Sequence, residues 1–436
     1  MENTKKVAFI TLGCKVNTAE TEGMKKLFRE AGYEIVSGDE YADVYIVNTC
    51  TVTNMGDRKS RQMLRKAHKL NPNAVIAAVG CFAQVSPDKA AKIEGVNLVV
   101  GNNLKHSIVE LVENHRSTEK QKYVYERKAL CEFEELPIET YEDHTRAFIK
   151  VQDGCDQFCS YCIIPYARGP IRSRKLDDVL KEAENLAARG FKEIVLTGIH
   201  LSSYGEKEGV GLTQLIEELH NVEGIERIRL GSLEPLFLTP DFINNIKNLP
   251  RLCPHFHISL QSGCDSTLKR MNRKYTTRDY RNIVNLLREK VEDVTVTTDV
   301  MVGFPGETEE EFQKSYEFCR EIGFLRMHVF QYSPRKGTPA ARYPDQVDGR
   351  IKEERSRLMI KLAETLQKEV MSKFIGRQMP VLLEQPVAEN SNDMEGHTPN
   401  YITVIVALDS KKAGEIINVR LESIEGGRIR AVALDS

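Results

Sequence analysis

The chain has 436 residues, of which 41% are hydrophobic and 28% charged, as in ordinary globular proteins. This length predicts two or three domains rather than one compact core, because a single domain usually has about 100–200 residues. The 61 basic and 63 acidic residues give a net charge of −2, so the overall charge does not indicate nucleic-acid binding. Apolar runs fall short of the ~20 residues of a membrane span, and no secretory leader is recognisable. We therefore expect a cytoplasmic protein without a membrane partner.

Residues 1–115 are predicted to form an open parallel α/β domain, because short β-rich runs alternate with helical patterns. The expected strands are 7–12, 44–48, 74–80 and 98–100, and the expected helices lie near 17–31, 55–70, 87–94 and 105–114. Cys14, Cys50 and Cys81 each follow the end of one of these strands. Since the carboxyl ends of parallel strands share one edge of a sheet, the three thiols are predicted to converge there.

The remaining chain is predicted to contain a linker and two further domains. Residues 116–143 are charged and lack a strand pattern, which is typical of a linker. Residues 144–373 are predicted to form a partial (β/α)6 barrel, whose active face is made by the loops after the strands. Its strands are expected near 148–151, 193–198, 226–230, 255–260, 294–301 and 326–332, before a long helix near 350–373. Residues 374–436 are rich in strands and glycine and predict a small five-stranded β-barrel. The predicted fold class is therefore α/β.

Ten cysteines in a reducing compartment indicate metal ligation, catalysis or packing rather than disulfides. Cys155, Cys159 and Cys162 follow the first strand of the central domain with the spacing C-x3-C-x2-C. No fourth cysteine lies nearby, which disfavours a closed tetrahedral zinc site. A cubane cluster held by three thiolates would instead keep one iron open for a small molecule. A zinc knuckle or a chance grouping is the alternative.

The C-x3-C-x2-C segment resembles the motif of the radical S-adenosylmethionine (SAM) superfamily. This resemblance implies a 4Fe–4S cluster whose open iron binds SAM, and one-electron reduction of the cofactor to a 5′-deoxyadenosyl radical. Three further segments resemble cofactor-binding parts of the superfamily, and Tyr161 lies within the cysteine motif itself. The residues expected to contact SAM are Tyr161 near the adenine, Gly198 at the methionine amino group, Ser259 and Gln261 at the ribose, and Asp299, Gly303 and Phe304 at the adenine.

The N-terminal cysteines by themselves could be packing residues, because free cysteine is commonly buried. Upstream of a radical SAM motif, however, the segments around Cys14, Cys50 and Cys81 resemble the methylthiotransferase family, and the C-terminal region resembles its TRAM module. The resemblance implies that these three cysteines hold a second 4Fe–4S cluster, whose open iron carries the sulfur to be inserted. The other four cysteines, Cys131, Cys253, Cys264 and Cys319, are expected to have no ligand role.

Three basic segments follow loops of the predicted active face. Each could be an ordinary solvated surface, but together they predict contact with RNA phosphates. They contain Arg58, Arg61 and Arg65; Arg168, Arg172 and Arg174; and Arg270, Arg273 and Lys274. The C-terminal module has more acidic than basic residues, so we expect any RNA contact there to use shape and stacking, with Asn400 and Tyr401 as candidates.

The family resemblance implies insertion of a methylthio group at carbon 2 of a modified adenosine at position 37 of tRNA, beside the anticodon. The segments around Cys50 and residues 260–265 most resemble the branch that acts on N6-threonylcarbamoyladenosine. The alternatives are the N6-isopentenyladenosine branch, a methylthiotransferase of a ribosomal protein, and a non-enzymatic Fe–S or zinc RNA-binding protein.

The expected substrate sets a requirement for its pocket. A threonylcarbamoyl group carries a carboxylate, so its pocket should offer a cation, whereas an isopentenyl pocket should be apolar. The resemblance also implies an electron donor, such as flavodoxin or ferredoxin, and a sulfur donor as partners. No separate acid or base residue is predicted.

Overall fold

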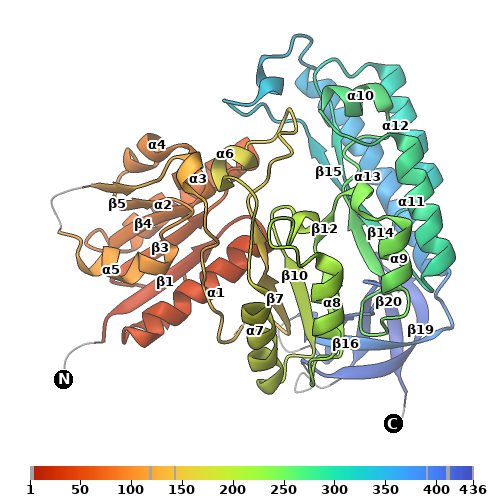
Figure 1. Ribbon diagram of the computed structural model, residues 1–436, viewed down its shortest axis with the longest axis horizontal. Coiled ribbons are helices and arrows are strands. Elements are labelled where there is room, and N and C mark those ends of the chain that lie inside the picture. Colours follow the sequence, from red (N-terminus) through yellow and green to blue (C-terminus); the bar gives the residue numbers. More distant parts are fainter. Residues whose placement is uncertain (1–3, 117–119, 142–143, 389–390, 409–412, 435–436) are drawn as a thin grey trace.

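Figure 1 shows a computed structural model of the chain, in which an N-terminal α/β sheet, a central β/α barrel and a C-terminal β-barrel follow one another. The structure describes residues 4–116, 120–141, 144–388, 391–408 and 413–434. Within these ranges, no helix combines the length and the apolar character that crossing a membrane requires. The predicted α/β fold class is confirmed.

Six parallel strands form the N-terminal sheet in the order β2-β1-β3-β4-β5-β6. They are β1 (Lys6–Thr11), β2 (Glu34–Val36), β3 (Val44–Thr49), β4 (Val75–Gly80), β5 (Val96–Val100) and β6 (Gln121–Tyr123). Helices α1 (Lys15–Glu30) and α5 (Ile108–Glu113) cover one face, and α2 (Asn54–Leu70), α3 (Cys81–Val85) and α4 (Pro87–Ala91) cover the other. Because both faces are covered, the central strands are almost continuously apolar, as in other parallel sheets.

The segment after this sheet differs from the predicted strandless linker. It contributes strand β6, which pairs with β5 at the edge of the sheet. The prediction missed β6 because a three-residue edge strand shows no alternation of apolar and polar residues. Further on, Leu136, Ile138 and Tyr141 are buried. A Cβ on Gly23 of α1 would come within 2.7 Å of the Leu136 Cβ, so this segment lies tightly against α1.

The central barrel is made of parallel strands in two sheets, β11-β10-β7 and β12-β13-β14-β15, which a parallel bridge between Ile228 and Leu252 joins. The strands are β7 (Arg146–Lys150), β10 (Glu193–Thr197), β11 (Arg227–Leu230), β12 (Ser232–Leu233), β13 (His255–Ile258), β14 (Thr295–Val302) and β15 (Arg326–Gln331). The helices are α7 (Leu176–Ala188), α8 (Leu212–His220), α9 (Pro240–Ile246), α11 (Thr277–Lys290), α12 (Glu309–Ile322) and α13 (Gly349–Ser372). The predicted partial barrel of six β/α units is therefore confirmed.

Short elements complete the connections of this barrel and of the N-terminal sheet. They are α6 (Ile164–Arg168), α10 (Asp265–Arg270), the β8 (Gln152–Asp153) and β9 (Arg172–Ser173) pair, and 3₁₀ turns at Lys105–Ser107, Arg127–Ala129, Leu201–Ser203, Pro235–Phe237 and Pro339–Arg342. The two edge strands of the barrel are β7 and β15. Figure 1 shows α1 between the N-terminal sheet and β7, and α1 contacts both β1 and β7. The N-terminal unit thus covers one open edge of the barrel.

The C-terminal barrel is closed, with the strand order β16-β17-β18-β20-β19, as predicted. Its strands are β16 (Gln378–Pro386), β17 (Asp393–His397), β18 (Thr403–Ala407), β19 (Ile416–Glu425) and β20 (Arg428–Ala433). Strand β17 has no β-branched residue, so its own sequence does not indicate a strand. Its Gly396 is required by packing, because an added Cβ would lie 2.3 Å from the Leu382 carbonyl oxygen.

Buried arginines join the C-terminal barrel to the amino ends of the central strands. Arg229 of β11 donates to the Pro399 carbonyl at 2.9 Å and pairs with Glu193 of β10 at 2.7 Å. Arg227 donates to the His397 carbonyl at 2.9 Å. Because Glu193 holds the guanidinium that reaches the other barrel, its charge state should affect the stability of this junction.

We expect the Glu193 carboxylate to contribute a pH-dependent part of the stability. Burial alone would raise its pKa, but Arg229, Arg146 and Arg227 lower the pKa of Glu193 to about 2. Its stabilising effect is thus complete above the unfolded pKa of about 4.5 and is lost as pH falls toward the folded pKa. Between pH 6 and pH 3, the unfolding free energy of the wild type should fall by about 2 kcal/mol more than that of Glu193→Gln in urea titrations. Equal losses in both proteins would contradict this role.

Candidate functional site

The three N-terminal thiols converge at the carboxyl edge of the sheet, as the strand ends predict. Cys14 lies between β1 and α1, Cys50 follows β3, and Cys81 begins α3 directly after β4. A Cβ on Gly13 would come within 3.3 Å of the Cys50 Sγ, so the turn that carries Cys14 passes close to Cys50. Electrostatic interactions link Cys81 to both other thiols and Cys50 to Cys14. Burial raises the pKa of Cys14, and it raises the pKa of Cys50 to about 11.

A buried arginine from the central barrel completes this N-terminal site. Arg168, the last residue of α6, donates from Nε to the Cys81 Sγ at 3.2 Å and from Nη2 to the Asn17 side chain at 2.6 Å. It also pairs with Glu20 of α1 and, at 3.4 Å, with Asp153. The site is therefore assembled from both the N-terminal sheet and the barrel.

The position of Arg168 corrects the prediction that residues 168–174 form an RNA-binding surface. Arg168, Arg172 and Arg174 are all buried. Arg172 pairs with Asp153 at 3.2 Å, and Arg174 pairs with Glu182 at 3.1 Å. Fully buried arginines normally require such carboxylate partners, and here acidic side chains from several parts of the chain supply them.

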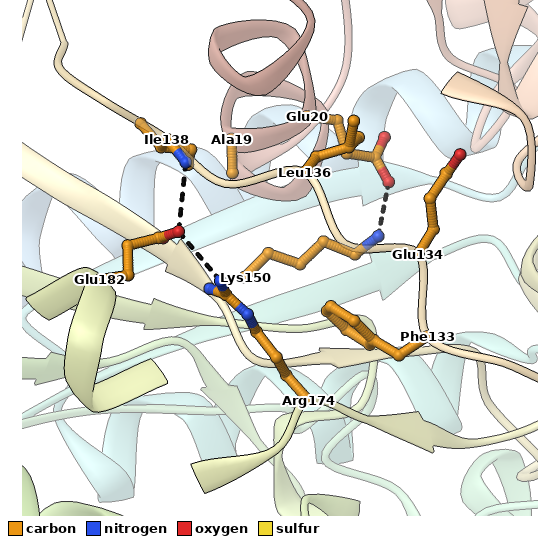
Figure 2. Close-up of a pocket in the computed structure, with 9 residues that line it drawn as sticks. All are labelled: Ala19, Glu20, Phe133, Glu134, Leu136, Ile138, Lys150, Arg174 and Glu182. Carbon is orange, nitrogen blue, oxygen red and sulfur yellow. Dashed lines mark hydrogen bonds and ion pairs between the residues drawn. The ribbon is translucent and has the colours of Figure 1, made fainter. Parts of the chain in front are cut away.

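Figure 2 shows how the N-terminal unit, the segment after it and the barrel meet beside this network. Lys150 of β7 donates to Glu20 of α1 at 2.8 Å, and Glu182 of α7 accepts from the Ile138 backbone at 3.2 Å. The enclosed space measures about 10 Å³, which holds at most about one water molecule. This region is consequently a packed interface and is too small to be a substrate pocket.

The second thiol set lies on the loop after β8. Gly154 has φ 77°, and a Cβ there would lie 1.9 Å from the Pro170 carbonyl oxygen, so only glycine fits before Cys155. Electrostatic interactions link Cys155, Cys159 and Cys162. Burial raises the pKa of Cys155 and of Cys162 to about 12, so a metal must displace a proton from each thiol on binding.

Arg273 donates to a cysteine sulfur of this loop, as Arg168 does in the N-terminal site. Its Nη1 donates to the Cys159 Sγ at 3.3 Å, and its Nη2 pairs with Glu234 at 2.6 Å. Its side chain is 5% exposed and also lies over the Tyr275 ring. The prediction that Arg273 contacts RNA is therefore wrong, because a carboxylate and a thiol hold this guanidinium inside the protein.

Both thiol sets fit an iron–sulfur cluster in the chemistry of their donors. Among the described residues, no three His, Cys, Asp or Glu side chains are placed to hold a single metal ion. Each set instead offers three cysteine sulfurs and one arginine N–H directed at a sulfur. A neutral thiol accepts hydrogen bonds only weakly, whereas an anionic thiolate is the ligand form and pairs well with a guanidinium.

The residues predicted to bind SAM lie at the carboxyl ends of the barrel strands. Tyr161 and the buried Phe304 meet edge to face with ring centroids 6.5 Å apart, so the cysteine loop lies against the loop after β14. Gln261 has φ 67°, and its backbone N–H donates to the Asp299 carbonyl at 2.8 Å.

The other residues predicted to bind SAM lie on neighbouring loops. Gly198 follows β10 and lies beside Gln152. The Ser259 carbonyl accepts a hydrogen bond from the Tyr275 hydroxyl at 2.7 Å, and the Gly303 N–H donates to Glu307 at 2.8 Å. The Asp299 carboxylate faces His257 at 3.4 Å. Asp299 lies within β14, and the other predicted residues belong to loops or strand ends at one end of the barrel.

The remaining candidates for RNA contact fall into two groups. Arg58 and Arg65 are exposed on α2, Arg61 is half-buried there, and Lys274 is exposed. Arg270 is partly exposed, pairs with Glu311, and borders a groove of about 500 Å³ with Phe158 and Lys269. Loop residue Arg335 pairs with Asp57 of α2 at 2.9 Å, which holds this helix beside the loop after β15. These side chains therefore surround the face that carries the cysteine loop.

The predicted RNA contacts of the C-terminal barrel are corrected. Asn400 is fully buried, and Tyr401 stacks between His255 and His397 with centroid distances of 4.5 and 4.8 Å. Both residues lie at the amino end of the central barrel, where histidine rings occupy the two faces of the partly buried Tyr401 ring on which a base would stack. Tyr401 has φ 70°, an uncommon conformation for a non-glycine residue, and this tight turn places its ring inside the junction.

Sequence reasoning missed the polar residues on the inner face of the barrel. His257 of β13 and His328 of β15 lie near the Asp299 carboxylate, and Lys15 of α1 is close enough to interact electrostatically with His328. The alternation His255, Phe256, His257 within a strand was the available signal, because it places two histidines on one face of a mostly buried strand.

Comparison with known proteins identifies the family. The radical SAM superfamily matches residues 149–319, and the uncharacterized protein family UPF0004 matches residues 6–101. A Bacillus subtilis (strain 168) protein named threonylcarbamoyladenosine tRNA methylthiotransferase MtaB is 44% identical over 421 residues, covering 95% of this chain and 93% of that protein. The chain belongs to the radical SAM methylthiotransferase family.

Membership in the radical SAM methylthiotransferase family makes this protein an enzyme that uses SAM and a 4Fe–4S cluster. A second branch is represented by a tRNA-2-methylthio-N(6)-dimethylallyladenosine synthase of Alkaliphilus oremlandii (strain OhILAs), 35% identical over 96% of this chain and 90% of that protein. The structure of the radical SAM methyltransferase TsrM from Kitasatospora setae shares the fold, with a TM-score of 0.56, 15% identity and coverage of 75% of this chain and 73% of that chain. Membership in this family of enzymes excludes the non-enzymatic alternative.

Proposed function

We propose that this methylthiotransferase inserts a methylthio group at carbon 2 of N6-threonylcarbamoyladenosine at position 37 of tRNA. The observation that carries the proposal is the pair of three-thiol sites, one at the sheet edge and one on the first barrel loop, with an arginine at one sulfur of each. The 44% identity to a protein named for this substrate, against 35% to one named for the dimethylallyl substrate, favours the threonylcarbamoyl branch.

In this proposal the two thiol sets have different ligands. Cys155, Cys159 and Cys162 would hold the SAM-binding cluster, and Cys14, Cys50 and Cys81 would hold a second 4Fe–4S cluster. When bound, these groups supply the one-electron chemistry and the sulfur that amino-acid side chains lack. Arg168 and Arg273 would each donate to a ligand sulfur and hold it in place, because a carboxylate holds each guanidinium: the buried Glu20 for Arg168 and the partly exposed Glu234 for Arg273.

The loops around the cysteine motif would position SAM. Tyr161, supported by the buried Phe304, offers an aromatic surface for the adenine, and Gly198 leaves room where a Cβ would meet Gln152 at 2.9 Å. Backbone groups near Ser259, Gln261 and Gly303, together with Asp299, complete the proposed set. Their role is to orient the cofactor and exclude water from it.

The partners and the domain roles are part of the same proposal. Residues 1–115 would carry the second cluster, 144–373 the SAM site, and 374–436 a TRAM-like module. Arg58, Arg61, Arg65, Arg270 and Lys274 would contact phosphates of the anticodon arm, and the target base would leave its stack to enter between the two thiol sites. An electron donor such as flavodoxin or ferredoxin, a sulfur donor and a cytoplasmic location follow from a reductive reaction on tRNA.

Nucleoside analysis of tRNA tests the proposed substrate. Cells lacking the gene should lose 2-methylthio-N6-threonylcarbamoyladenosine and accumulate the unmethylthiolated nucleoside, and the purified enzyme with reductant and SAM should restore it. Mass spectrometry of digested tRNA measures both. Loss of the isopentenyl derivative instead, or an unchanged tRNA pool with altered ribosomal protein mass, would contradict the proposal and support one of the other branches.

A further inference from the structure

The inner face of the central barrel is polar. His257, Thr297 and Asp299 are neighbours on β13 and β14, with His257–Thr297 at 3.0 Å and His257–Asp299 at 3.4 Å. His328 of β15 stands in register with Asp299, and its ring lies 6.0 Å from that of His257. His328 is exposed, while His257 and Asp299 are partly exposed. These side chains on the inner face are therefore accessible to solvent.

The amino end of the barrel closes this face with a layer of cations. The Tyr401 ring lies below Arg229 at 4.8 Å, Arg326 at 5.5 Å and Arg146 at 5.7 Å. Burial alone would raise the pKa of Tyr401, but the nearby cations lower it. The two carboxylates at this level, Glu193 and Glu384, are already paired with Arg229 and Arg146.

Lys15 adds a cation from the N-terminal unit. It is the first residue of α1, directly after Cys14, and it is exposed although α1 lies against the edge strand of the barrel. Its ammonium interacts electrostatically with Tyr401, Arg146 and Arg229, and with Glu193, which is itself paired with Arg229. The positive charge of Lys15 also contributes to lowering the pKa of His255 and of His328. Lys15 therefore faces the inner side of the barrel near its cationic floor.

Two of these cations lack a carboxylate partner among the described residues. Lys15 makes no ion pair or hydrogen bond there, and Arg326 makes one hydrogen bond, to the Thr403 hydroxyl at 3.1 Å. The one carboxylate that interacts with Lys15, Glu193, is already paired with Arg229. An accessible ammonium beside other cations and without an ion pair of its own is a favourable place for an anion. The exposed His328 and the partly exposed Asp299 and His257 leave the approach to it polar rather than apolar.

We propose that Lys15, supported by Arg326, binds the carboxylate of the N6-threonylcarbamoyl group and thereby selects this nucleoside over one with an isopentenyl group. The inference rests on the proposed function and assigns a specificity-determining residue within it. An isopentenyl group would leave the Lys15 ammonium desolvated and unpaired, which opposes binding of that substrate as well as favouring the other. The location next to Cys14 would place the target base between the two thiol sites.

The test compares Lys15→Gln, Lys15→Arg and wild type on tRNA carrying N6-threonylcarbamoyladenosine and on the same tRNA with that carboxylate methylated. Loss of a charge-assisted hydrogen bond should raise KM about 10- to 100-fold in Lys15→Gln with little change in kcat. Methylation of the carboxylate should weaken the wild type by a similar factor and should not weaken Lys15→Gln further. Lys15→Arg should keep most of the affinity, and Lys181→Gln, on the exposed face of α7, serves as control.

Iron content and SAM cleavage without tRNA should be unchanged in all of these variants. The assignment of Lys15 would be overturned by any of three results: Lys15→Gln has the same KM as the wild type, methylation of the carboxylate weakens Lys15→Gln as much as it weakens the wild type, or Lys15→Gln loses iron. None of these results would contradict the proposed function. A wild type that does not methylthiolate the threonylcarbamoyl tRNA at all would overturn the proposed function and this inference together.

Discussion

Replacing Cys81 by alanine is expected to reduce the iron of the reconstituted enzyme from about eight to about four atoms per chain while SAM cleavage continues. Cys81 lies in the N-terminal site with Cys14 and Cys50, apart from the loop that carries the other three thiols. Loss of one ligand there should therefore remove one cluster only. Such an enzyme should produce 5′-deoxyadenosine with dithionite and SAM but should not modify tRNA.

The corresponding cysteine substitution on the barrel loop should cause the same loss of iron but should also stop SAM cleavage. Cys159→Ala is expected to lose about four iron atoms as well, but to abolish SAM cleavage. Cys131→Ala, in an exposed thiol of the segment between the sheet and the barrel, should keep all iron and both activities. Iron assay and chromatography of 5′-deoxyadenosine measure these outcomes. Full iron content in Cys14→Ala, Cys50→Ala and Cys81→Ala would refute the second cluster.

Replacing Arg168 by methionine is expected to lower the unfolding free energy by about 3–5 kcal/mol, the usual cost of leaving a buried ion pair without one partner. Arg168 and its partners Glu20 and Asp153 have fully buried side chains. Without Arg168, Lys150 would be the one cation of this network that pairs with both carboxylates, at 2.8 Å from each. Lys105 would remain on Glu20 and Arg172 on Asp153, each at 3.2 Å. The same change removes the N–H at the Cys81 sulfur, so the spectrum of the N-terminal cluster should also shift.

Denaturant unfolding of the anaerobic enzyme measures the first effect, and electron paramagnetic resonance measures the second. Arg65→Met, on the exposed face of α2, is the matched control and should change stability by less than about 0.5 kcal/mol. An Arg168→Met enzyme as stable as Arg65→Met would show that the buried network does not hold the two units together. An unchanged cluster spectrum would separate Arg168 from the proposed ligand set.

The amino-acid sequence by itself determined the longer strands and helices and the two cysteine sets, but not the short strand β2 (Glu34–Val36). The spacing of Cys155, Cys159 and Cys162 and the alternation of strands with helices are properties of residues close together in the chain, so they are readable without a structure. The convergence of Cys14 and Cys81 was also predictable, because every parallel strand of such a sheet ends at the same edge. The short edge strand β6 was not predicted, because its pairing with β5, and not its own residue pattern, makes it a strand.

Only the tertiary structure decided what the charged and aromatic side chains do. Arg168 and Arg273 looked like surface cations, yet each is buried between a thiol and a carboxylate that lie 39 to 148 residues away in the chain. Tyr401 looked like a stacking platform for RNA and instead closes the barrel. The physical reason is that a charge is buried only where an opposite charge meets it, and that meeting depends on the whole fold. The same dependence left Lys15 unpaired at the inner face of the barrel.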